Sequence, residues 1–390
     1  MSVLFCHDGP VEKDEFNNYY GIGFNDKLFK KYEILDNDIS IAIRVHKTMN
    51  NVLNDNYLPL KQYKVIECPN LASIKGIFLN KHKCIKILQK AIKESDIIVI
   101  RLPSNIGNLA AKIARKYKKR YIIELVGCPW DALKYHSFIG KLIAPIMYLK
   151  TKHNVKKAKN VIYVTEKFLQ KRYSNDNNNI GCSDVILNNL DIKNLNKRIE
   201  KINSMNGKII LGTIGIVDIK YKGQEYVIKA LRKLLDDGFT NIEYQLVGPG
   251  NTERLMNIAK KYNVLDKVKF IGPLTHDDIF KWLDKIDIYI QPSNTEGLPR
   301  SVIEAMSRGC PCIGSDVGGI PELISVECLF RKKDVLELRN KISNLLLSKK
   351  ALEKNARYSF ENARKYEQET LQNIRKNFYN QINLKEGKNE

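Results

Sequence analysis

The sequence predicts an α/β protein built from two doubly wound domains. Three observations indicate this class. The chain has 390 residues, which is enough for two or three domains that each bury their own core. Short β-type runs alternate with helical patterns in both halves, as in parallel sheets wrapped by helices. The composition, 43% hydrophobic and 28% charged, is that of a globular protein. General disorder and a fibrous repeat are therefore excluded.

The predicted elements follow one another in a regular order, which is clearest in the second half. In the first half we predict strands over residues 2–6, 40–45, 64–66, 96–101, 121–126, 161–164 and 184–187. In the second half we predict strands over 208–213, 242–247, 268–271, 288–291 and 311–315, alternating with helices over 224–235, 252–262, 277–283 and 300–307. After residue 334 the pattern predicts continuous helix to about residue 384.

A polar, Asn-rich stretch over residues 188–206 separates the two halves and suits a linker. We therefore expect an N-terminal domain over 1–203, a C-terminal domain over 204–365 and a final helical segment over 366–390.

The net charge of +22 is unevenly distributed. Residues 1–200 carry 34 Lys and Arg against 19 Asp and Glu, a net +15, which leaves +7 for the rest of the chain. The excess is densest over 81–120 and 141–172. Such patches attract nucleic acid, anionic membranes or phosphorylated substrates, and a merely solvated basic surface is the alternative. Since no RNA-recognition signature or zinc finger accompanies the charge, no nucleic-acid partner is expected.

Other features of the chain limit its location and its chemistry. No window approaches the roughly 18 apolar residues of a membrane-spanning helix. The first residues lack the pattern of a secretory signal, so we expect the protein to be cytoplasmic. Eight cysteines are scattered without CxxC pairs, which favours reduced, buried thiols. Cys310-Pro-Cys312 lies in a predicted strand, so we favour a structural role over a redox or metal role.

The loops after the C-terminal strands carry the most informative residues, because ligands of open α/β sheets bind beyond the carboxyl ends of the strands. After the strand over 208–213, Lys220 and Lys222 precede a helix whose first amides could face an anion. After the strand over 288–291, Glu296 lies in a loop and Glu304 in the following helix. With a rise of 1.5 Å per residue, these carboxylates would reach different parts of an extended ligand, whereas a glycosidase places two carboxylates around one bond.

These residues resemble a known family. Glu296-x7-Glu304 followed by Ala-Met-x-x-Gly-x-Pro, and then Ser-Asp-x-Gly-Gly-x-Pro-Glu322, resembles the donor-site signature of glycosyltransferase family 4. That family contains retaining nucleotide-sugar transferases with the GT-B fold. The resemblance extends over about residues 208–325. In the first half, His7-Asp-Gly-Pro and Gly21-Ile-Gly23 resemble bacterial surface-polysaccharide members, as do Val126-Gly-Cys-Pro-Trp-Asp131 and Tyr163-Val-Thr-Glu166.

The resemblance implies a GT-B architecture, in which two Rossmann-like domains face a central cleft and the segment over 366–390 returns to the first domain. It also implies site residues. Lys222 would hold the donor diphosphate, Glu304 would accept the ribose hydroxyls, and Glu296 would contact the transferred sugar. Further contacts with the donor would come from Gly297 and Leu298 through backbone amides, from Leu274 at the base, and from Gly21 and Gly23 beside the diphosphate.

Two positions depart from the family pattern. Where many members have an arginine after the glycine of the first loop, this chain has Ile216. One phosphate cation is therefore missing, or it is supplied by Lys220 or Arg300. Where many have a histidine near the strand over 121–126, this chain has Gly127, which leaves the acceptor-side residue open.

Asp131 and His136 are nearby candidates for the acceptor side, and either is as readily structural. Asp36-Asn-Asp38 resembles the DxD metal site of the other large transferase fold, but we interpret it as a solvated turn. We expect no metal and no cofactor.

The sequence thus predicts retaining transfer of a sugar from a UDP-sugar, or alternatively a GDP-sugar, to a hydroxyl of a glycan or lipid-linked acceptor. The expected setting is bacterial surface polysaccharide biosynthesis, at the anionic inner face of the cell membrane. Two alternatives stay open. One is a non-catalytic nucleotide-sugar-binding subunit, since a fold and a donor site do not prove turnover. The other is a GT-B epimerase that acts on the nucleotide sugar itself.

Overall fold

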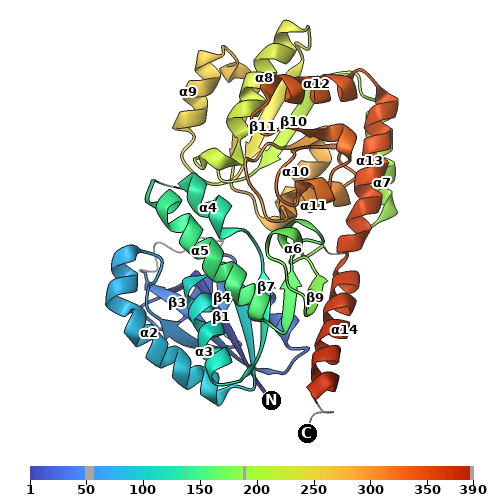
Figure 1. Ribbon diagram of the computed structural model, residues 1–390. Helices are drawn as coiled ribbons and strands as arrows, with labels where there is room; N and C mark the ends of the chain where they lie inside the picture. Colours follow the sequence, from blue (N-terminus) through green and yellow to red (C-terminus); the bar gives the residue numbers. More distant parts are fainter. Residues whose placement is uncertain (49–56, 137, 188–189, 387–390) are drawn as a thin grey trace. The chain divides into compact units, whose positions relative to one another are not determined.

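The computed structural model describes residues 1–48, 57–136, 138–187 and 190–386 (Figure 1). These residues form two compact units. Unit 1 contains Met1–Cys182 together with the described residues from Gln372 onward, and unit 2 contains Ser183–Leu371. Each unit is built around its own sheet, which is parallel in unit 2 and mainly parallel in unit 1.

The sheet of unit 1 has nine strands: β1 (Ser2–Lys13), β2 (Tyr19–Gly21), β3 (Asp38–Lys47), β4 (Leu58–Leu60), β5 (Lys64–Cys68), β6 (Ile97–Leu102), β7 (Arg120–Leu125), β8 (Asn160–Tyr163) and β9 (Asn178–Gly181). Its parallel part runs in the order β5-β3-β1-β6-β7-β8-β9, and β2 and β4 pair antiparallel beside the far end of β1. The first four residues of β6 are completely buried. Parallel strands are covered on both faces, which explains their continuous apolar sequences.

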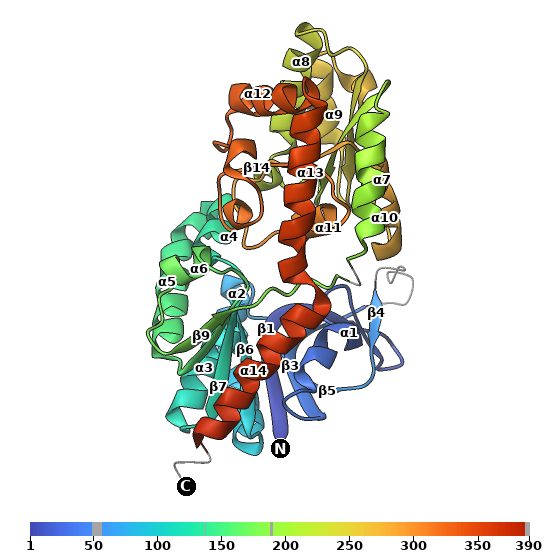
Figure 2. The same ribbon diagram turned by 90° about the vertical axis from the view of Figure 1, so that its right-hand side faces the viewer.

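The helices of unit 1 are α1 (Asp26–Phe29), α2 (Ile74–Glu94), α3 (Asn105–Lys116), α4 (Pro129–His136), α5 (Phe138–Lys157), α6 (Phe168–Arg172) and α14 (Gln368–Glu386). Helices α2, α3 and α5 lie side by side on one face of the sheet (Figure 1). Ser73 and Ser104 begin α2 and α3 by accepting hydrogen bonds from backbone amides of the first turn. Figure 2 shows α14, which buries Phe378 and Tyr379, alongside the strands of this unit.

Unit 2 has six parallel strands: β10 (Ile209–Ile214), β11 (Ile242–Val247), β12 (Val268–Gly272), β13 (Ile288–Gln291), β14 (Cys312–Ser315) and β15 (Leu329–Phe330). Its helices are α7 (Ile192–Asn203), α8 (Gln224–Asp236), α9 (Glu253–Lys261), α10 (His276–Lys285), α11 (Arg300–Ser307), α12 (Val335–Leu346) and α13 (Lys349–Ala363). The strand order is β12-β11-β10-β13-β14-β15. This is the order of a doubly wound sheet, so the predicted fold class is confirmed.

One predicted strand is wrong. Residues 184–187 form no strand, and the sheet of unit 1 ends instead with β9, which the sequence analysis missed. Strand β9 pairs only with β8, in a register that places Ile180 beside Ile162. An edge strand has one neighbour and needs no continuous apolar run, which is why its Asn-rich sequence gave no strand signal.

The predicted linker contains a helix. Within the described part of 188–206, α7 begins where Asp191 accepts a hydrogen bond from the Lys193 amide. Leu195 and Ile202 are buried on the side of α7 that packs in unit 2. The buried Arg198 donates to the carbonyl oxygens of Ile286 and Leu283, which end helix α10. Unit 2 therefore begins ahead of the expected boundary near residue 203.

The C-terminal part is not one continuous helix. Helix α12 ends at Leu346, and Ser348 begins α13 by accepting a hydrogen bond from the Ala351 amide. A 3₁₀ turn, η7 (Arg364–Tyr366), then separates α13 from α14. The eight cysteines are all buried free thiols, as predicted. No helix within the described ranges is long and apolar enough to cross a bilayer.

Candidate functional site

The predicted donor-site residues gather at the carboxyl edge of the sheet in unit 2. The chain order reverses between the neighbouring strands β10 and β13, so their connections leave toward opposite faces. A crevice opens at such a reversal, and it is where ligands of this fold class bind. The loop over 215–223 follows β10 and leads into α8. The loop over 292–299 follows β13 and leads into α11.

An ion pair joins the two loops. The Nζ atom of Lys222, in the 3₁₀ turn η3 (Lys220–Lys222), lies 2.8 Å from Oε1 of Glu296. Both side chains are partly shielded, with exposed fractions of 21% for Lys222 and 12% for Glu296. Burial by itself would lower the pKa of the Lys222 ammonium, but the charge and hydrogen bond of Glu296 outweigh it and the pKa is raised. Lys222 is therefore a positive charge held at the strand reversal.

Close backbone contacts bring the loops together, and these contacts need glycine. Gly223 has φ +74°, and a Cβ atom there would lie 2.0 Å from the carbonyl oxygen of Pro292. Gly318, with φ +60°, would place a Cβ atom 2.1 Å from the carbonyl oxygen of Glu296. A side chain at either position would combine a strained backbone with a steric clash. The Asn294 amide also donates to the Tyr221 carbonyl oxygen over 2.7 Å, so the two loops are hydrogen-bonded directly.

The two helices that leave the strand reversal begin without side-chain caps. Helix α8 follows Gly223 and α11 follows Pro299, and neither residue has a side chain that caps the first turn. The first amides of a helix carry a partial positive charge and readily bind an anion. Two such helix starts beside Lys222 make this edge electropositive.

Glu304 lies one turn inside α11 and is half-buried. Burial raises the pKa of its carboxyl group, and nearby Arg300 and His276 oppose the rise only in part. The structure gives this carboxylate no hydrogen-bond donor among the described residues. A ligand hydroxyl that donated to Glu304 would therefore compensate for lost hydration.

The remaining predicted donor contacts lie at the same edge. Gly297 accepts a hydrogen bond of 2.7 Å from the Gly319 amide, so its carbonyl is engaged in joining the loops after β13 and β14. Leu298 is half-buried in the loop before α11, and Leu274 is half-buried in the loop after β12. Lys220 is exposed, and its side chain has no acceptor within the described residues.

The sequence analysis missed a buried hydrogen-bond network that holds Glu296. Oε1 of Glu296 accepts from Ser293 Oγ over 2.7 Å and from Gln291 Nε2 over 3.0 Å. Gln291 Oε1 in turn accepts from the Tyr289 hydroxyl over 2.7 Å. Gln291 and Ser293 are fully buried, so the carboxylate is fixed before any ligand binds. Both polar residues are visible in the sequence at the end of β13, but that pattern does not distinguish a buried network from a solvated turn.

Gly21 and Gly23 belong to unit 1, apart from the residues above. Gly21 is buried at the end of β2, where a Cβ atom would lie 2.3 Å from the Phe24 carbonyl oxygen. Gly23 is exposed, and nothing lies within 4 Å of a Cβ atom there. Packing therefore explains glycine at residue 21 but not at residue 23.

The acceptor-side candidates differ in what surrounds them. Asp131 forms a two-point ion pair with Arg172, with contacts of 2.6 and 3.3 Å, so its carboxylate is engaged within unit 1. The side chain of His136 lies outside the described residues. His7 lies within β1, at the shift in its register against β3, and accepts a hydrogen bond at Nδ1 from the Gly9 amide. Burial, and then the nearby arginines 101 and 44, lower the pKa of His7 to about 3, so the imidazole is neutral at physiological pH.

Asp36 takes part in local structure. It pairs with the amino group of Met1 at 3.0 Å and accepts a hydrogen bond from the Asp38 amide. Asp38 is the first residue of β3, so the predicted turn is instead the start of a strand. No group of three or more potential metal ligands occurs among the residues that the structure describes.

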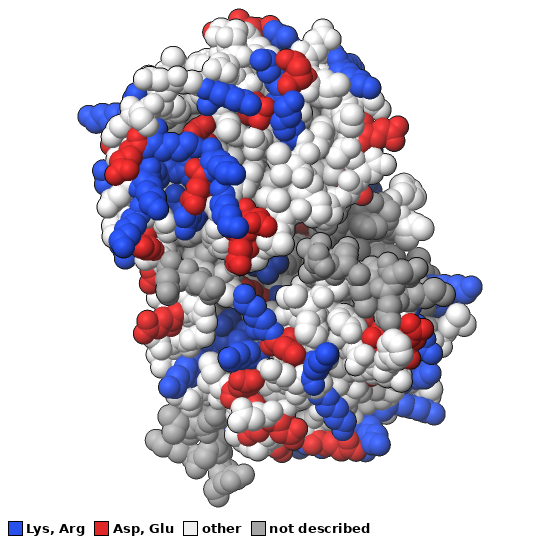
Figure 3. Space-filling view, turned by 180° about the vertical axis from the view of Figure 1, so that it is seen from behind, with Lys and Arg blue, Asp and Glu red and all other residues white. Residues whose placement is uncertain are grey.

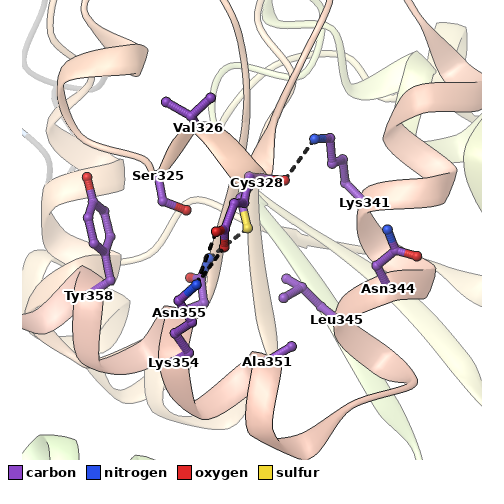
Figure 4. Close-up of a pocket in the computed structure, with 11 residues that line it drawn as sticks. Ser325, Val326, Cys328, Lys341, Asn344, Leu345, Ala351, Lys354, Asn355 and Tyr358 are labelled. Atoms are coloured by element: carbon purple, nitrogen blue, oxygen red, sulfur yellow. Dashed lines mark hydrogen bonds and ion pairs between the residues drawn. The ribbon is translucent and has the colours of Figure 1, made fainter.

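A hollow elsewhere in unit 2 is not the donor site. It has a volume of about 520 Å³ and lies between α12, α13 and the 3₁₀ turn η6 (Val326–Cys328), which precedes β15 (Figure 4). This is the amino edge of the sheet, opposite to the strand reversal. Lys354 forms an ion pair with the Glu327 carboxylate, and Lys341 donates to the backbone carbonyl oxygen of Glu327, so both lysines are engaged within the hollow.

Comparisons with known proteins agree with the geometry. The family model described as glycosyl transferases group 1 matches residues 195–366, a range that contains the whole carboxyl edge of unit 2. Protein CapJ from Staphylococcus aureus is 36% identical over 377 residues, covering 95% of this chain and 93% of CapJ. The chain belongs to the group 1 glycosyl transferases.

Further matches extend this result. This chain is 37% identical over 110 residues to AmsK from Erwinia amylovora, which is an amylovoran biosynthesis glycosyltransferase. The match covers 26% of this chain and 27% of AmsK. HepE from Anabaena, solved in complex with UDP, superposes with a TM-score of 0.67 at 16% identity, covering 96% of this chain and 98% of HepE. At that identity the superposition shows the fold alone, which is GT-B.

Proposed function

We propose that this glycosyltransferase moves a sugar from a nucleotide diphosphate sugar, in the first place a UDP-sugar, to an acceptor hydroxyl with retention of configuration. The observation that carries this proposal is the Lys222–Glu296 ion pair at the strand reversal of unit 2, flanked by two uncapped helix starts. The complex of HepE with UDP supports a uridine nucleotide as the donor class to test first.

The proposed chemistry centres on the leaving group. When the bond between the anomeric carbon and the diphosphate breaks, its electron pair stays on the diphosphate, and negative charge grows there. The Lys222 ammonium and the first amides of α8 and α11 offer positive charge to that group without having to reorganise. Fixed cations of this kind can do the work of a metal ion, so we propose a reaction that needs no metal.

Donor binding would also change the role of Glu296. Without donor, Glu296 neutralises Lys222. A bound diphosphate would take over the ammonium, and the carboxylate would become free to accept hydrogen bonds from the sugar hydroxyls. Gln291 and Ser293 would keep it in place meanwhile. Glu304, one turn along α11, would accept the ribose hydroxyls at the other end of the donor.

Retention requires the acceptor oxygen to attack the face that the diphosphate leaves. The acceptor hydroxyl then forms the new bond to the anomeric carbon, and its proton passes to the departing diphosphate. We propose that His7 borders the acceptor side, because it follows the last residue of β1 that pairs with β6, where the register of β1 against β3 also shifts.

We propose a glycan or lipid-linked acceptor, used at the inner face of the cell membrane. The role of AmsK in amylovoran biosynthesis supports a polysaccharide product. The positive charge of residues 1–200 supports contact with anionic lipid. Charge on the face opposite to the view of Figure 1 is mixed, with acidic side chains among the basic ones (Figure 3).

A ligand screen followed by a turnover assay tests the proposal. Nucleotide sugars and nucleoside diphosphates are first compared by thermal shift, since a specific ligand stabilises the folded state by mass action. The best donor is then incubated with enzyme, with no acceptor present, and released nucleoside diphosphate is measured. Slow release supports a transferase. Binding without release would indicate a non-catalytic subunit, and conversion of the donor without release would indicate an epimerase.

A further inference from the structure

Helix α5 carries a continuous apolar surface that faces solvent. Five large side chains form it, each between 53% and 76% exposed: Phe138, Ile139, Leu142, Ile146 and Leu149. Phe138, Leu142, Ile146 and Leu149 are spaced by three or four residues, and Ile139 lies next to them, so all five share one side of the first three turns. Isolated exposed apolar residues are normal on a protein surface, but a row of five on one helix indicates an interaction site. We call this row the α5 apolar stripe.

The exposure of the stripe is set by the packing of α5, because the opposite side of the helix is buried within unit 1. Ala144, Met147 and Val155 are buried there. Asn154 is also buried and donates to Asn108 Oδ1 of α3 over 2.7 Å. Arg115 of α3 donates to the side-chain oxygen Oδ1 of Asn154, also over 2.7 Å. This buried pairing sets the rotation of α5 and keeps the stripe in solvent.

Lysines border the stripe and continue it. Five lysines of α5 are exposed: Lys141, Lys150, Lys152, Lys156 and Lys157. The sequence of α5 contains no Asp or Glu, and within the described residues no carboxylate forms an ion pair with these lysines. The exposed side of α5 is thus mainly apolar in its first three turns, with Lys141 beside the stripe, and basic in its last two.

We propose that α5 lies on an anionic lipid bilayer, with the apolar stripe inserted among the headgroups and the lysines bound to lipid phosphates. An apolar face bordered by Lys is the pattern of a helix that binds in the plane of a membrane interface. Charge complementarity selects this occupant over a second copy of the chain. In a two-fold dimer the same lysines would meet across the interface and repel one another.

The position of the stripe fits a lipid-linked acceptor, and in this respect the inference rests on the proposed function. Helix α5 begins after β7 and α4, at the carboxyl edge of the unit 1 sheet, and it ends just before β8 at the amino edge (Figure 1). The apolar turns therefore lie toward the edge where a ligand of this unit would bind. The basic turns extend the contact away from that edge.

Vesicle sedimentation of the full chain tests the inference. We expect binding to vesicles of phosphatidylglycerol and phosphatidylcholine, and at least tenfold weaker binding to pure phosphatidylcholine. The variant Ile139→Ser/Leu142→Ser/Leu149→Ser should bind anionic vesicles about tenfold or more weakly. The variant Lys141→Gln/Lys150→Gln/Lys156→Gln should lose roughly 100-fold at low salt, and its residual binding should depend less on salt.

A matched control removes apolar side chains that are equally exposed but lie in unit 2. Val326 and Leu347 are 81% and 74% exposed, and Val326→Ser/Leu347→Ser should bind vesicles like the wild type. Wild-type vesicle binding by the stripe variant would overturn the inference. So would a stripe variant that changes only the oligomeric mass in light scattering, since that result would assign the stripe to self-association.

Release of nucleoside diphosphate from the donor, measured without vesicles, separates this inference from the proposed function. The stripe variant, the lysine variant and the unit 2 control should all release nucleoside diphosphate at the wild-type rate, because none of them alters the donor site. If the wild type released none while vesicle binding followed the pattern above, the proposed function would fail and the membrane surface would stand.

Discussion

Replacing Lys222 by alanine removes the cation that the structure holds in an ion pair with Glu296 at the strand reversal of unit 2. The fold should survive this change. Glu296 loses its cation but keeps the hydrogen bonds from Ser293 and Gln291, and Gly223 still holds the loop against Pro292. The effect should therefore appear in turnover rather than in folding.

The size of the effect follows from the local electrostatics. Two unit charges about 4 Å apart interact by about 4 kcal/mol at an effective dielectric constant near 20. That value is an upper limit, because the Lys222 side chain is 21% exposed and solvent screens part of the interaction. A loss of about 2.7 to 4 kcal/mol of transition-state stabilisation corresponds to a turnover reduced by roughly 100- to 1000-fold.

The assay is steady-state release of nucleoside diphosphate, with thermal melting to verify that the variant is folded. Charge grows on the leaving group in the transition state, so the loss should fall mainly on kcat. Lys220→Ala is the matched control, because Lys220 lies in the same loop with an exposed and unpaired side chain. Its loss should stay below about tenfold. Equal, small effects at Lys222 and Lys220 would refute the assignment of Lys222 to the diphosphate.

Two further predictions follow from the same site. Burial raises the pKa of Glu304 in the folded state above 4.5, its value in the unfolded chain. At a pH between the unfolded and the folded pKa, the folded state therefore binds more protons than the unfolded state. The stability of the fold accordingly falls as pH rises through that range. Glu304→Gln should accordingly raise the melting temperature of the donor-free protein at pH 7, and this gain should disappear toward pH 4. The same variant should bind nucleoside diphosphate more weakly in calorimetry. Unchanged binding would contradict the ribose role of Glu304. Transferase activity should persist in EDTA, whereas complete loss that manganese restores would overturn the metal-free proposal.

The fold was predictable where the sequence repeats one physical pattern. In unit 2 each strand is a short, buried apolar run and each helix has an apolar face, so β10 to β14 were found within a few residues of their observed bounds. Where polar residues form regular structure, the prediction failed. The buried Arg198 takes an apolar position on α7, and its hydrogen bonds to the end of α10 cannot be seen from local composition.

The sequence indicated candidate residues for the site but not the interactions between them. Glu296 and Lys222 were singled out separately, from the loops that carry them. That they form an ion pair depends on the strand order, which brings loops 74 residues apart to the same edge. The supporting roles of Gln291 and Ser293 could not be read from the sequence either, because a polar residue after a strand is equally compatible with a solvated turn.

The apolar stripe on α5 shows a similar limit. Its residues and lysines are visible in the sequence, but an amphipathic helix normally buries its apolar face. Only the structure places Phe138, Leu142 and Leu149 on the exposed side, because α5 packs through Asn154 and a row of small residues instead.

A proton NMR time course of a UDP-sugar with the enzyme and an acceptor tests the central claim most directly, since one spectrum reports the donor, the nucleotide and the new glycoside together. The account predicts that the anomeric signal of the donor decays while free UDP and a product signal of the same anomeric configuration grow in equal amounts. An unchanged donor, an epimerised donor without free UDP, or a product of inverted configuration would each contradict retaining transfer at the Lys222–Glu296 site.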